Sequence, residues 1–235
     1  MWCPRWWVTV PLGVLGSVAL TVGAARAEAQ GNVGGRVALL ERAGPRTADL
    51  AHAVVWLETL DGDGGGASAD GAPAEIVMES REFRPAVRVV APGSAVTFPN
   101  YDPFRHNVFS NTGPGVFDLG LYGRSERREA RVARAGVYPV FCNIHSRMVA
   151  YVLAVDSRWH AQAGDDGRWS IADVPAGRYR LHAWHDRGGE HVRELDVPAG
   201  GVADADVQLD ARGWRPTRHR NKYGQDYPPE VRDRY

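Results

Sequence analysis

The feature that most constrains the fold of this chain is its lack of any sustained 3.6-residue apolar period after residue 27. Short extended runs alternate instead with turns rich in Gly, Pro, Asp and Asn. Many short strands separated by turns are typical of β-sandwiches, so the chain is predicted to be all-β. The runs expected to form strands are 36–40, 53–58, 75–79, 87–91, 95–99, 137–142, 149–155, 168–171, 178–184, 190–197 and 204–209.

Changes in composition divide the chain into blocks. Residues 61–73 (DGDGGGASADGAP) are rich in Gly, Ala and Asp, which predicts a linker. Residues 212–235 are rich in Arg, Tyr and Pro without apolar periodicity, which predicts a disordered tail. Between these segments, residues 74–156 and 157–211 are predicted to form two sandwiches, and residues 31–60 supply strands ahead of the linker.

The first 27 residues have the pattern of a secretory signal peptide. Arg5 lies in a short positive start, residues 6–22 are largely apolar, and Ala25-Arg26-Ala27 offers a cleavage site between small residues. An uncleaved membrane anchor is the alternative, because the apolar run approaches spanning length. Cleavage is favoured, and it predicts a periplasmic protein with no stable membrane span.

The charge balance gives no sign of a polyanionic partner. Charged residues make up 24% of the chain, and acidic and basic residues are equal at 28 each. No general attraction to nucleic acid or to an anionic membrane follows from this balance.

Signal cleavage removes Cys3 and leaves Cys142 as the only cysteine of the mature chain. Secreted proteins normally use cysteines in pairs. A single remaining cysteine is a reactive thiol, an intermolecular bridge or a metal ligand.

The residues around Cys142 favour a metal ligand. Cys142, His145 and Met148 form a Cys-x-x-His-x-x-Met array, and His106 follows the expected strand 95–99 on another loop. One thiolate, two imidazoles and one thioether are the ligands of a blue-copper electron-transfer site. If Cys142 ends one strand and Met148 opens the next, His145 lies on the loop between them. The four residues therefore predict one mononuclear type 1 copper.

Two other chemistries use the same types of residue. Zinc is the main rival metal, but a thioether is a poor zinc ligand. A Cys–His nucleophile pair would favour a cysteine at a helix N-terminus, where the pKa of the thiol is lowered. Cys142 instead follows Tyr-Pro-Val-Phe, which indicates a strand.

The copper motif resembles the cupredoxin family over about a third of the chain. The ligand loop, with two residues in each gap, looks most like that of the amicyanins, copper carriers of methylamine oxidation. The wider sequence is also similar to proteins labelled methylamine-utilisation proteins. The segments that carry this likeness are His-Asn-Val-Phe-Ser from His106, Phe-Asp-Leu-Gly from Phe117 and Cys-Asn-Ile-His from Cys142.

The resemblance implies roles for residues around the ligands. Asn107 would brace the two ligand loops and hydrogen-bond toward the cysteine sulfur, and a plain turn asparagine is the alternative. His145 would reach the surface within an apolar patch and pass electrons to an unidentified redox partner protein. Pro103, Phe104 and Ile144 are the candidates for that patch, unless they are simple loop packing.

A site with four protein ligands leaves no open position for a substrate, in contrast to catalytic metal centres. The chain is therefore expected to be an electron carrier and not an enzyme. The alternative is a non-redox copper-binding module, a chaperone or interaction domain of the periplasm, in which the second sandwich has the main task.

The later block is similar to the carboxypeptidase regulatory-like, or transthyretin-like, sandwich. The likeness lies in the turn before Arg168, the strand that follows it, and the Pro-Ala-Gly turn at Pro175. Residues 35–40 and 53–58 are similar to the opening strands of that module. We therefore expect the cupredoxin block to be inserted into a discontinuous second sandwich. An independent N-terminal extension is the simpler alternative.

Three further features have plainer interpretations. His182 and His185 suggest a second metal site, but residues three apart on a strand point to opposite faces. Trp169 and Trp184 are expected in a sandwich core. The arginines between 124 and 134 are interpreted as a solvated hairpin with interleaved glutamates, in preference to a docking site for an acidic partner.

Overall fold

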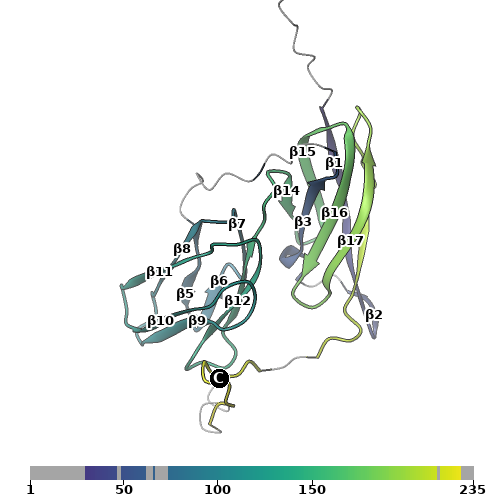
Figure 1. Cartoon of the computed structure of the whole chain (residues 1–235). Coiled ribbons are helices and arrows are strands. Elements are labelled where there is room, and N and C mark those ends of the chain that lie inside the picture. Colours follow the sequence, from purple (N-terminus) through teal and green to yellow (C-terminus); the bar gives the residue numbers. More distant parts are fainter. Residues whose placement is uncertain (1–29, 47–48, 62–65, 67–73, 216–217, 229–235) are drawn as a thin grey trace, which may run out of the picture.

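The computed structural model describes residues 30–46, 49–61, 66, 74–215 and 218–228 (Figure 1). The predicted signal peptide, nearly all of the predicted linker and the last seven residues lie outside the described residues. The described part is all-β, as predicted, with one 3-10 turn, η1 (Leu50–His52). None of its helices is long and apolar enough to cross a membrane.

The central sandwich, residues 74–154, holds the predicted copper ligands. One sheet has the strand order β10-β9-β12-β13-β7, the other has the order β11-β8-β4, and β5 and β6 form a separate hairpin. The strands are β4 (Ala74–Glu75), β5 (Val77–Glu79), β6 (Glu82–Arg84), β7 (Val87–Val90), β8 (Ala95–Pro99), β9 (His106–Ser110), β10 (Phe117–Tyr122), β11 (Arg127–Arg131), β12 (Gly136–Cys142) and β13 (Val149–Ala154).

The flanking sandwich lies beside the central one (Figure 1). Its sheets have the orders β15-β1-β18, with β2 paired to β1, and β14-β3-β16-β17. Its strands are β1 (Gln30–Glu41), β2 (Gly44–Arg46), β3 (Val54–Thr59), β14 (His160–Gln162), β15 (Arg168–Pro175), β16 (Gly177–His185), β17 (Gly189–Val197) and β18 (Val207–Asp210).

The strands of the flanking sandwich come from both sides of the central one in sequence. β3 pairs with β14 on one side and β16 on the other, and β1 pairs with β15 and β18. β1 and β3 precede the central sandwich, whereas β14, β15, β16 and β18 follow it. Each of the two main sheets therefore needs chain from both ends.

This pairing predicts the result of cutting the chain between Asp61 and Ala74. We expect a specific protease site placed there to be cut without loss of residues 30–61, because the backbone pairs of β1 and β3 continue to hold them. Size-exclusion chromatography of the cut protein should show one species. Elution of the N-terminal piece as a separate peak would indicate an independent extension.

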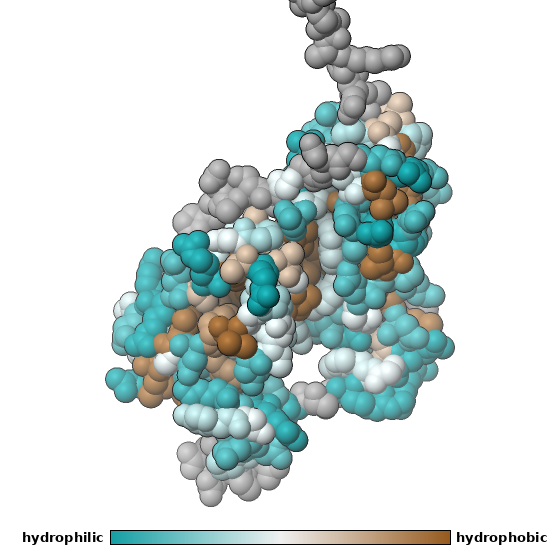
Figure 2. Space-filling model, in the orientation of Figure 1, coloured by the Kyte–Doolittle hydropathy of each residue, from teal (hydrophilic) through white to brown (hydrophobic). Residues whose placement is uncertain are grey.

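Each sandwich has its own apolar core, and a third cluster joins them. Trp169 is buried in the flanking core, as expected. Trp184 is also buried, and it packs with Val87 and Leu153 of the central sandwich. Figure 2 shows apolar side chains where the two sandwiches meet. This contact places the end of β16 against the central domain.

The sequence pattern missed β9 and gave the wrong arrangement for the arginine-rich segment. All five residues of β9 are buried, so the strand has no apolar–polar alternation to identify it. β10 and β11 do not form a hairpin, because β10 pairs with β9 in one sheet and β11 pairs with β8 in the other. Most of the arginines there are exposed, whereas Arg128 bonds the carbonyl oxygen of Leu119.

Candidate metal centre

The loop between β12 and β13, with the residues at its ends, positions three of the predicted ligands. Cys142 ends β12, and Met148 immediately precedes β13. The backbone N–H of Cys142 donates to the carbonyl of Met148 at 3.3 Å, and that of Met148 donates to the carbonyl of His145 at 3.1 Å. These bonds close a tight loop with His145 at its turn, as the spacing predicts.

The sequence predicts His106 on a loop, but it lies on the strand next to β12. It is the first residue of β9, whose residue Val108 lies opposite Cys142 on β12. Residues two apart on a strand share a face, so His106 points to the same side as Val108. The adjacent strand thereby brings an imidazole to the thiol from 36 residues away in sequence.

Three ligand atoms of these residues converge in the interior. Cys142 Sγ lies 3.6 Å from His106 Nδ1 and 3.4 Å from His145 Nδ1, and the two nitrogens are 3.1 Å apart. Such spacing suits three ligands that share one metal ion with bonds of about 2 Å. Exposure is 0% for His106 and Cys142 and 6% for His145. The donor set and its spacing therefore fit a single metal ion.

Met148 belongs to the same neighbourhood. It is 2% exposed and packs in the core cluster that contains Cys142. Its backbone bonds to Cys142 and His145 fix it at the end of the ligand loop. The fourth predicted residue is thus buried beside the other three.

His106 is held by a carboxylate that the sequence analysis did not predict. Asp102 Oδ2 lies 2.9 Å from His106 Nε2, the nitrogen on the far side of the ring from Cys142. A carboxylate at that position fixes the tautomer and the orientation of a metal-binding imidazole. Asp102 is four residues from His106, but isolated aspartates are too common in loops for that spacing to have been a signal.

Asp102 also anchors the β5–β6 turn. Its carboxylate accepts the backbone N–H of Ser80 at 2.7 Å and that of Arg81 at 3.0 Å. Both turn residues are left-handed, with φ of 57° and 62°, although neither is glycine. Such a conformation costs about 1–2 kcal/mol per residue. The two bonds to Asp102 offset this cost and tie the hairpin to the ligand His106.

Burial keeps the imidazoles neutral, which leaves their lone pairs free to bind metal. It lowers the pKa of His145 to about 4, with additional lowering by His106 and Arg81. Burial also lowers the pKa of His106, and the bond to Asp102 opposes that effect. The pKa of the Cys142 thiol is raised by burial, while backbone N–H groups of the surrounding loops oppose the rise. A bound cation would be needed to hold the thiolate, since metal binding displaces the thiol proton.

Asn107 braces the loops mainly through its backbone. Its carbonyl accepts the N–H of Asn143 at 2.9 Å, which links β9 to the ligand loop. Its backbone N–H bonds the sulfur of Cys142. Its side-chain amide donates to Asp118 at 2.6 Å. The side chain therefore turns toward β10, and the main chain makes the contact with sulfur.

The expectation that His145 reaches the surface is wrong, because only 6% of the residue is exposed. Phe104 lies over both imidazoles, with ring centroids 5.3 Å from His106 and 5.6 Å from His145. The guanidinium of Arg81 lies over Phe104 in turn, at 5.0 Å. Among the predicted patch residues, Pro103 and Ile144 are exposed and Phe104 is half-buried.

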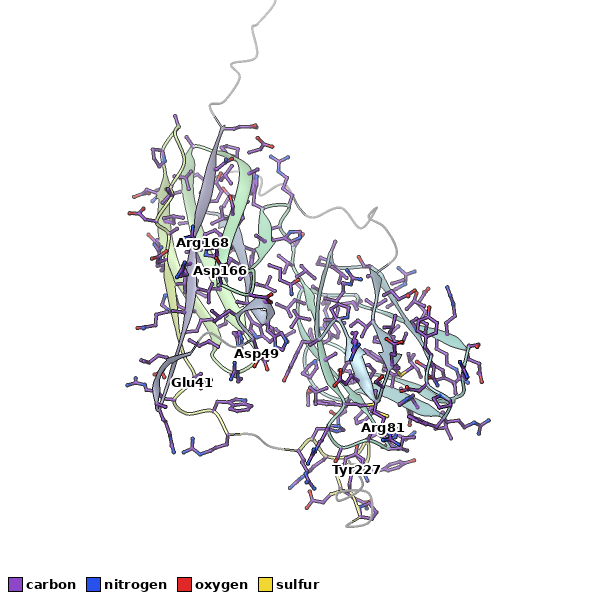
Figure 3. The ribbon with its side chains drawn as sticks, turned by 180° about the vertical axis from the view of Figure 1, so that it is seen from behind. Glu41, Asp49, Arg81, Asp166, Arg168 and Tyr227 are labelled. Carbon is purple, nitrogen blue, oxygen red and sulfur yellow. The ribbon has the colours of Figure 1, made fainter. Side chains whose placement is uncertain are left out.

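The predicted disordered tail includes an ordered segment, residues 218–228, here called the C-terminal strap. The chain returns after β18 to the ligand end of the central sandwich (Figure 1), and Tyr227 lies at that end in Figure 3. Polar and ring contacts hold this segment in place, and such contacts do not require apolar periodicity in the sequence. These are His219 Nε2 to the carbonyl of His145 (3.2 Å), the His219 ring on Phe141 (4.6 Å), Lys222 N–H to Asn143 Oδ1 (2.9 Å), Lys222 Nζ to Asp118 (2.6 Å) and Tyr227 O–H to the carbonyl of Cys142 (2.6 Å).

The strap bond from Tyr227 gives a direct prediction. Tyr227→Phe is expected to lower the free energy of unfolding by about 1 kcal/mol, because the buried carbonyl of Cys142 loses its donor. Tyr223→Phe is the matched control, since Tyr223 is 72% exposed. Denaturant unfolding of both variants measures the difference. Equal stabilities for the two variants would show that the strap bond contributes nothing.

Comparisons with known proteins give partial likenesses to copper proteins. No family model matches the chain, and no curated protein matches it. A purple cupredoxin from Nitrosopumilus maritimus is 24% identical with a TM-score of 0.32, over 35% of this chain and 99% of that one. Amicyanin from Paracoccus versutus is 18% identical with a TM-score of 0.34, over 42% of this chain and 97% of that one.

A copper-containing nitrite reductase from Thermus scotoductus is 26% identical with a TM-score of 0.35. That likeness covers 37% of this chain but only 23% of the reductase. Each of these likenesses is confined to less than half of the present chain.

Proposed function

We propose that this chain is an exported copper protein that transfers single electrons. His106, Cys142 and His145 would hold one copper ion, with Met148 as a weak fourth ligand. The observation that carries the proposal is the buried triangle of one sulfur and two imidazole nitrogens, with edges of 3.1 to 3.6 Å.

The donor set favours copper over zinc. Two imidazoles and a thiolate with a weak thioether are the ligands of electron-transfer copper, whereas structural zinc takes four strong donors. When bound, copper would supply one-electron chemistry by alternating between Cu(II) and Cu(I). Burial of Cys142 at 0% exposure also disfavours the alternative in which its thiol attacks a substrate.

The protein's own contribution would be rigidity and exclusion of water. Asp102 holds His106, the backbone of Asn107 and Asn143 joins the two ligand segments, and the strap covers the loop. Ligands that are fixed in this way change position little when the charge at the site changes. Phe104 and Ile144 would form the apolar surface through which a partner protein approaches.

Copper loading with a redox cycle tests the proposal. The mature protein, residues 28–235, should bind one equivalent of Cu(II) and develop an intense thiolate-to-copper absorption band. The band should bleach with reductant and return with oxidant. A protein that stays colourless and binds Zn²⁺ equally well would contradict the proposal. Copper that exchanges readily with a chelator, without reversible cycling, would favour the non-redox copper-binding module.

The two methionines of the mature chain provide a matched pair. Met148→Leu should keep the band but raise the reduction potential on the order of 60 mV, a tenfold change for a one-electron couple, because loss of the thioether destabilises Cu(II). Met78 is buried in the same core cluster, so Met78→Leu serves as the control. Spectroelectrochemistry measures both. An equal shift in the two variants would exclude a ligand role for Met148.

A further inference from the structure

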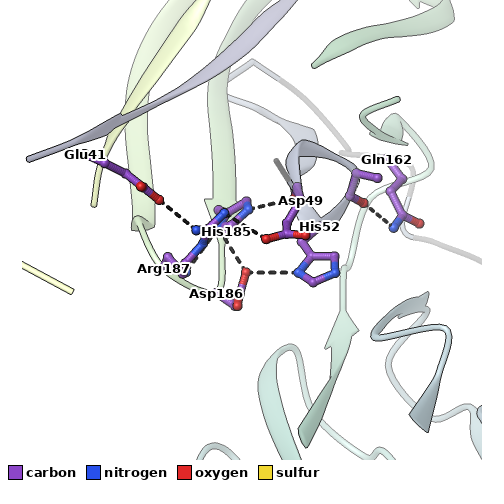
Figure 4. A network of polar contacts seen from close by, with 8 residues as sticks. Glu41, Asp49, His52, Gln162, His185, Asp186 and Arg187 are labelled. Atoms are coloured by element: carbon purple, nitrogen blue, oxygen red, sulfur yellow. Dashed lines mark hydrogen bonds and ion pairs between the residues drawn. The ribbon is translucent and has the colours of Figure 1, made fainter. Parts of the chain in front are cut away.

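A second convergence of ligand atoms lies in the flanking sandwich (Figure 4). His52 ends η1, His185 ends β16, and Asp186 follows it directly. Asp186 Oδ1 lies 3.2 Å from His52 Nδ1 and 3.0 Å from His185 Nδ1. All three ligand atoms lie within 4.8 Å of one another. Two imidazole nitrogens thus approach a single carboxylate oxygen.

The hydrogen bonds of His185 define which of its nitrogens carries the proton. Its Nε2 lies 2.9 Å from the carbonyl oxygen of Asp49, which can only accept, so Nε2 must donate. Its Nδ1 accepts the backbone N–H of Arg187 at 3.1 Å. These bonds place the lone pair on Nδ1, where the N–H of Arg187 occupies it in this structure. A backbone carbonyl bound to the opposite nitrogen is the usual support of a metal-binding histidine.

This tautomer leaves two acceptors facing each other. His185 Nδ1 lies 3.0 Å from a carboxylate oxygen of Asp186, which also carries only lone pairs. Two acceptors at that distance repel each other unless a positive charge lies between them. A cation bound by both atoms would supply that charge, and it would take the Nδ1 lone pair over from the N–H of Arg187.

The net charge around these residues also suits a cation. Asp186, Asp49 and Glu41 carry three negative charges, and Arg187 pairs with Glu41 at 2.7 Å and with Asp49 at 3.2 Å. The three carboxylates and the one guanidinium leave two negative charges in excess, and the hydrogen bond to Asp186 raises the pKa of His52. The side chains of His52 and Asp186 are 30% and 18% exposed, so an ion can reach the site from solvent.

We propose that His52, His185 and Asp186 bind one divalent cation of the zinc type. Two histidines and one carboxylate are a common zinc ligand set that leaves a fourth position for water. His52 precedes the central sandwich in the chain and His185 follows it, so the ion clamps the two parts of the flanking sandwich together. This site does not depend on the proposed copper centre.

The cluster differs from the His182–His185 pair considered in the sequence. His182 bonds Glu190 at 2.7 Å and Glu58 at 3.2 Å, and it stacks on Trp56. It therefore lies on the other face of β16, as strand geometry requires. The partner of His185 is a histidine 133 positions earlier, which no local spacing could indicate.

Zinc binding tests the proposal. Cys142→Ser is introduced first, so that the copper thiolate does not compete, and the full mature chain is titrated with Zn²⁺ by isothermal calorimetry. We expect His52→Gln and Asp186→Asn each to remove one equivalent of bound Zn²⁺, or to weaken its binding by at least about 10- to 100-fold. Loss of a residue that only supports a metal ligand already costs that much. His182→Gln is the matched control and should keep that equivalent.

Folding is checked separately, because His185 is fully buried and its loss could unfold the domain. His52 is partly exposed, so His52→Gln should keep the circular dichroism spectrum of the parent. Zinc should raise the melting temperature of the parent and of His182→Gln but not of His52→Gln. Equal zinc binding by folded His52→Gln and its parent, or no zinc equivalent lost in any of the variants, would overturn the proposal.

Discussion

Replacing Cys142 with serine is expected to abolish the intense visible absorption of the copper-loaded protein. The band requires a thiolate bound to the metal, and Cys142 is the only cysteine after residue 27. Loss of a residue that only supports a ligand costs about 10- to 100-fold in metal affinity. The fall in Cu(I) affinity should be larger here, because a hydroxyl is a poor ligand for a soft ion. Absorption spectra and competition with a Cu(I) chelator measure the two effects.

Ser146→Ala is the control for that substitution. Ser146 is buried in the same ligand loop, at 4% exposure, but lies outside the triangle of ligand atoms. It should keep both the band and the affinity. A band that survives in Cys142→Ser would show that the sulfur of residue 142 does not bind the metal.

The second large effect is expected from Asp102→Ala. The change removes the acceptor of two turn N–H groups and of His106 Nε2. One unsatisfied buried group costs about 1–3 kcal/mol, and His106 is the buried one because Ser80 and Arg81 are exposed, so the free energy of unfolding should fall by about 1–3 kcal/mol. Copper affinity should fall about 10- to 100-fold, because the ring of His106 loses the group that orients it.

Asp165→Ala is the matched control, since Asp165 is exposed on the flanking sandwich. Denaturant unfolding and copper competition should leave it close to the parent. If Asp102→Ala lowers stability but leaves copper affinity unchanged, Asp102 anchors the turn and does not position the ligand.

The four candidate copper ligands could be predicted from sequence because three of them share one loop. A Cys-x-x-His-x-x-Met spacing between two apolar runs defines that loop directly. His106 was found by its residue type, but its strand was missed because β9 is buried on both faces and lacks alternation. The all-β class followed from turn spacing, since it depends on the pattern of many short runs and not on any one of them.

The contacts that support the ligands could not be predicted from the sequence, for a different reason. Asp102, the strap and the pairing of His52 with His185 depend on segments that meet only after the chain has folded. The sequence predicts disorder for the strap because the segment has no apolar face. It is held by Tyr227, Lys222 and His219, whose polar and ring contacts leave no periodic pattern in the sequence.

X-ray absorption at the copper edge tests the central claim most directly, because it reports the atoms bound to the metal. The three converging atoms, Cys142 Sγ, His106 Nδ1 and His145 Nδ1, predict one sulfur and two imidazole nitrogens in the nearest shell of a protein that carries one copper ion. A shell of nitrogen and oxygen atoms without sulfur would contradict the assignment of the copper to this site.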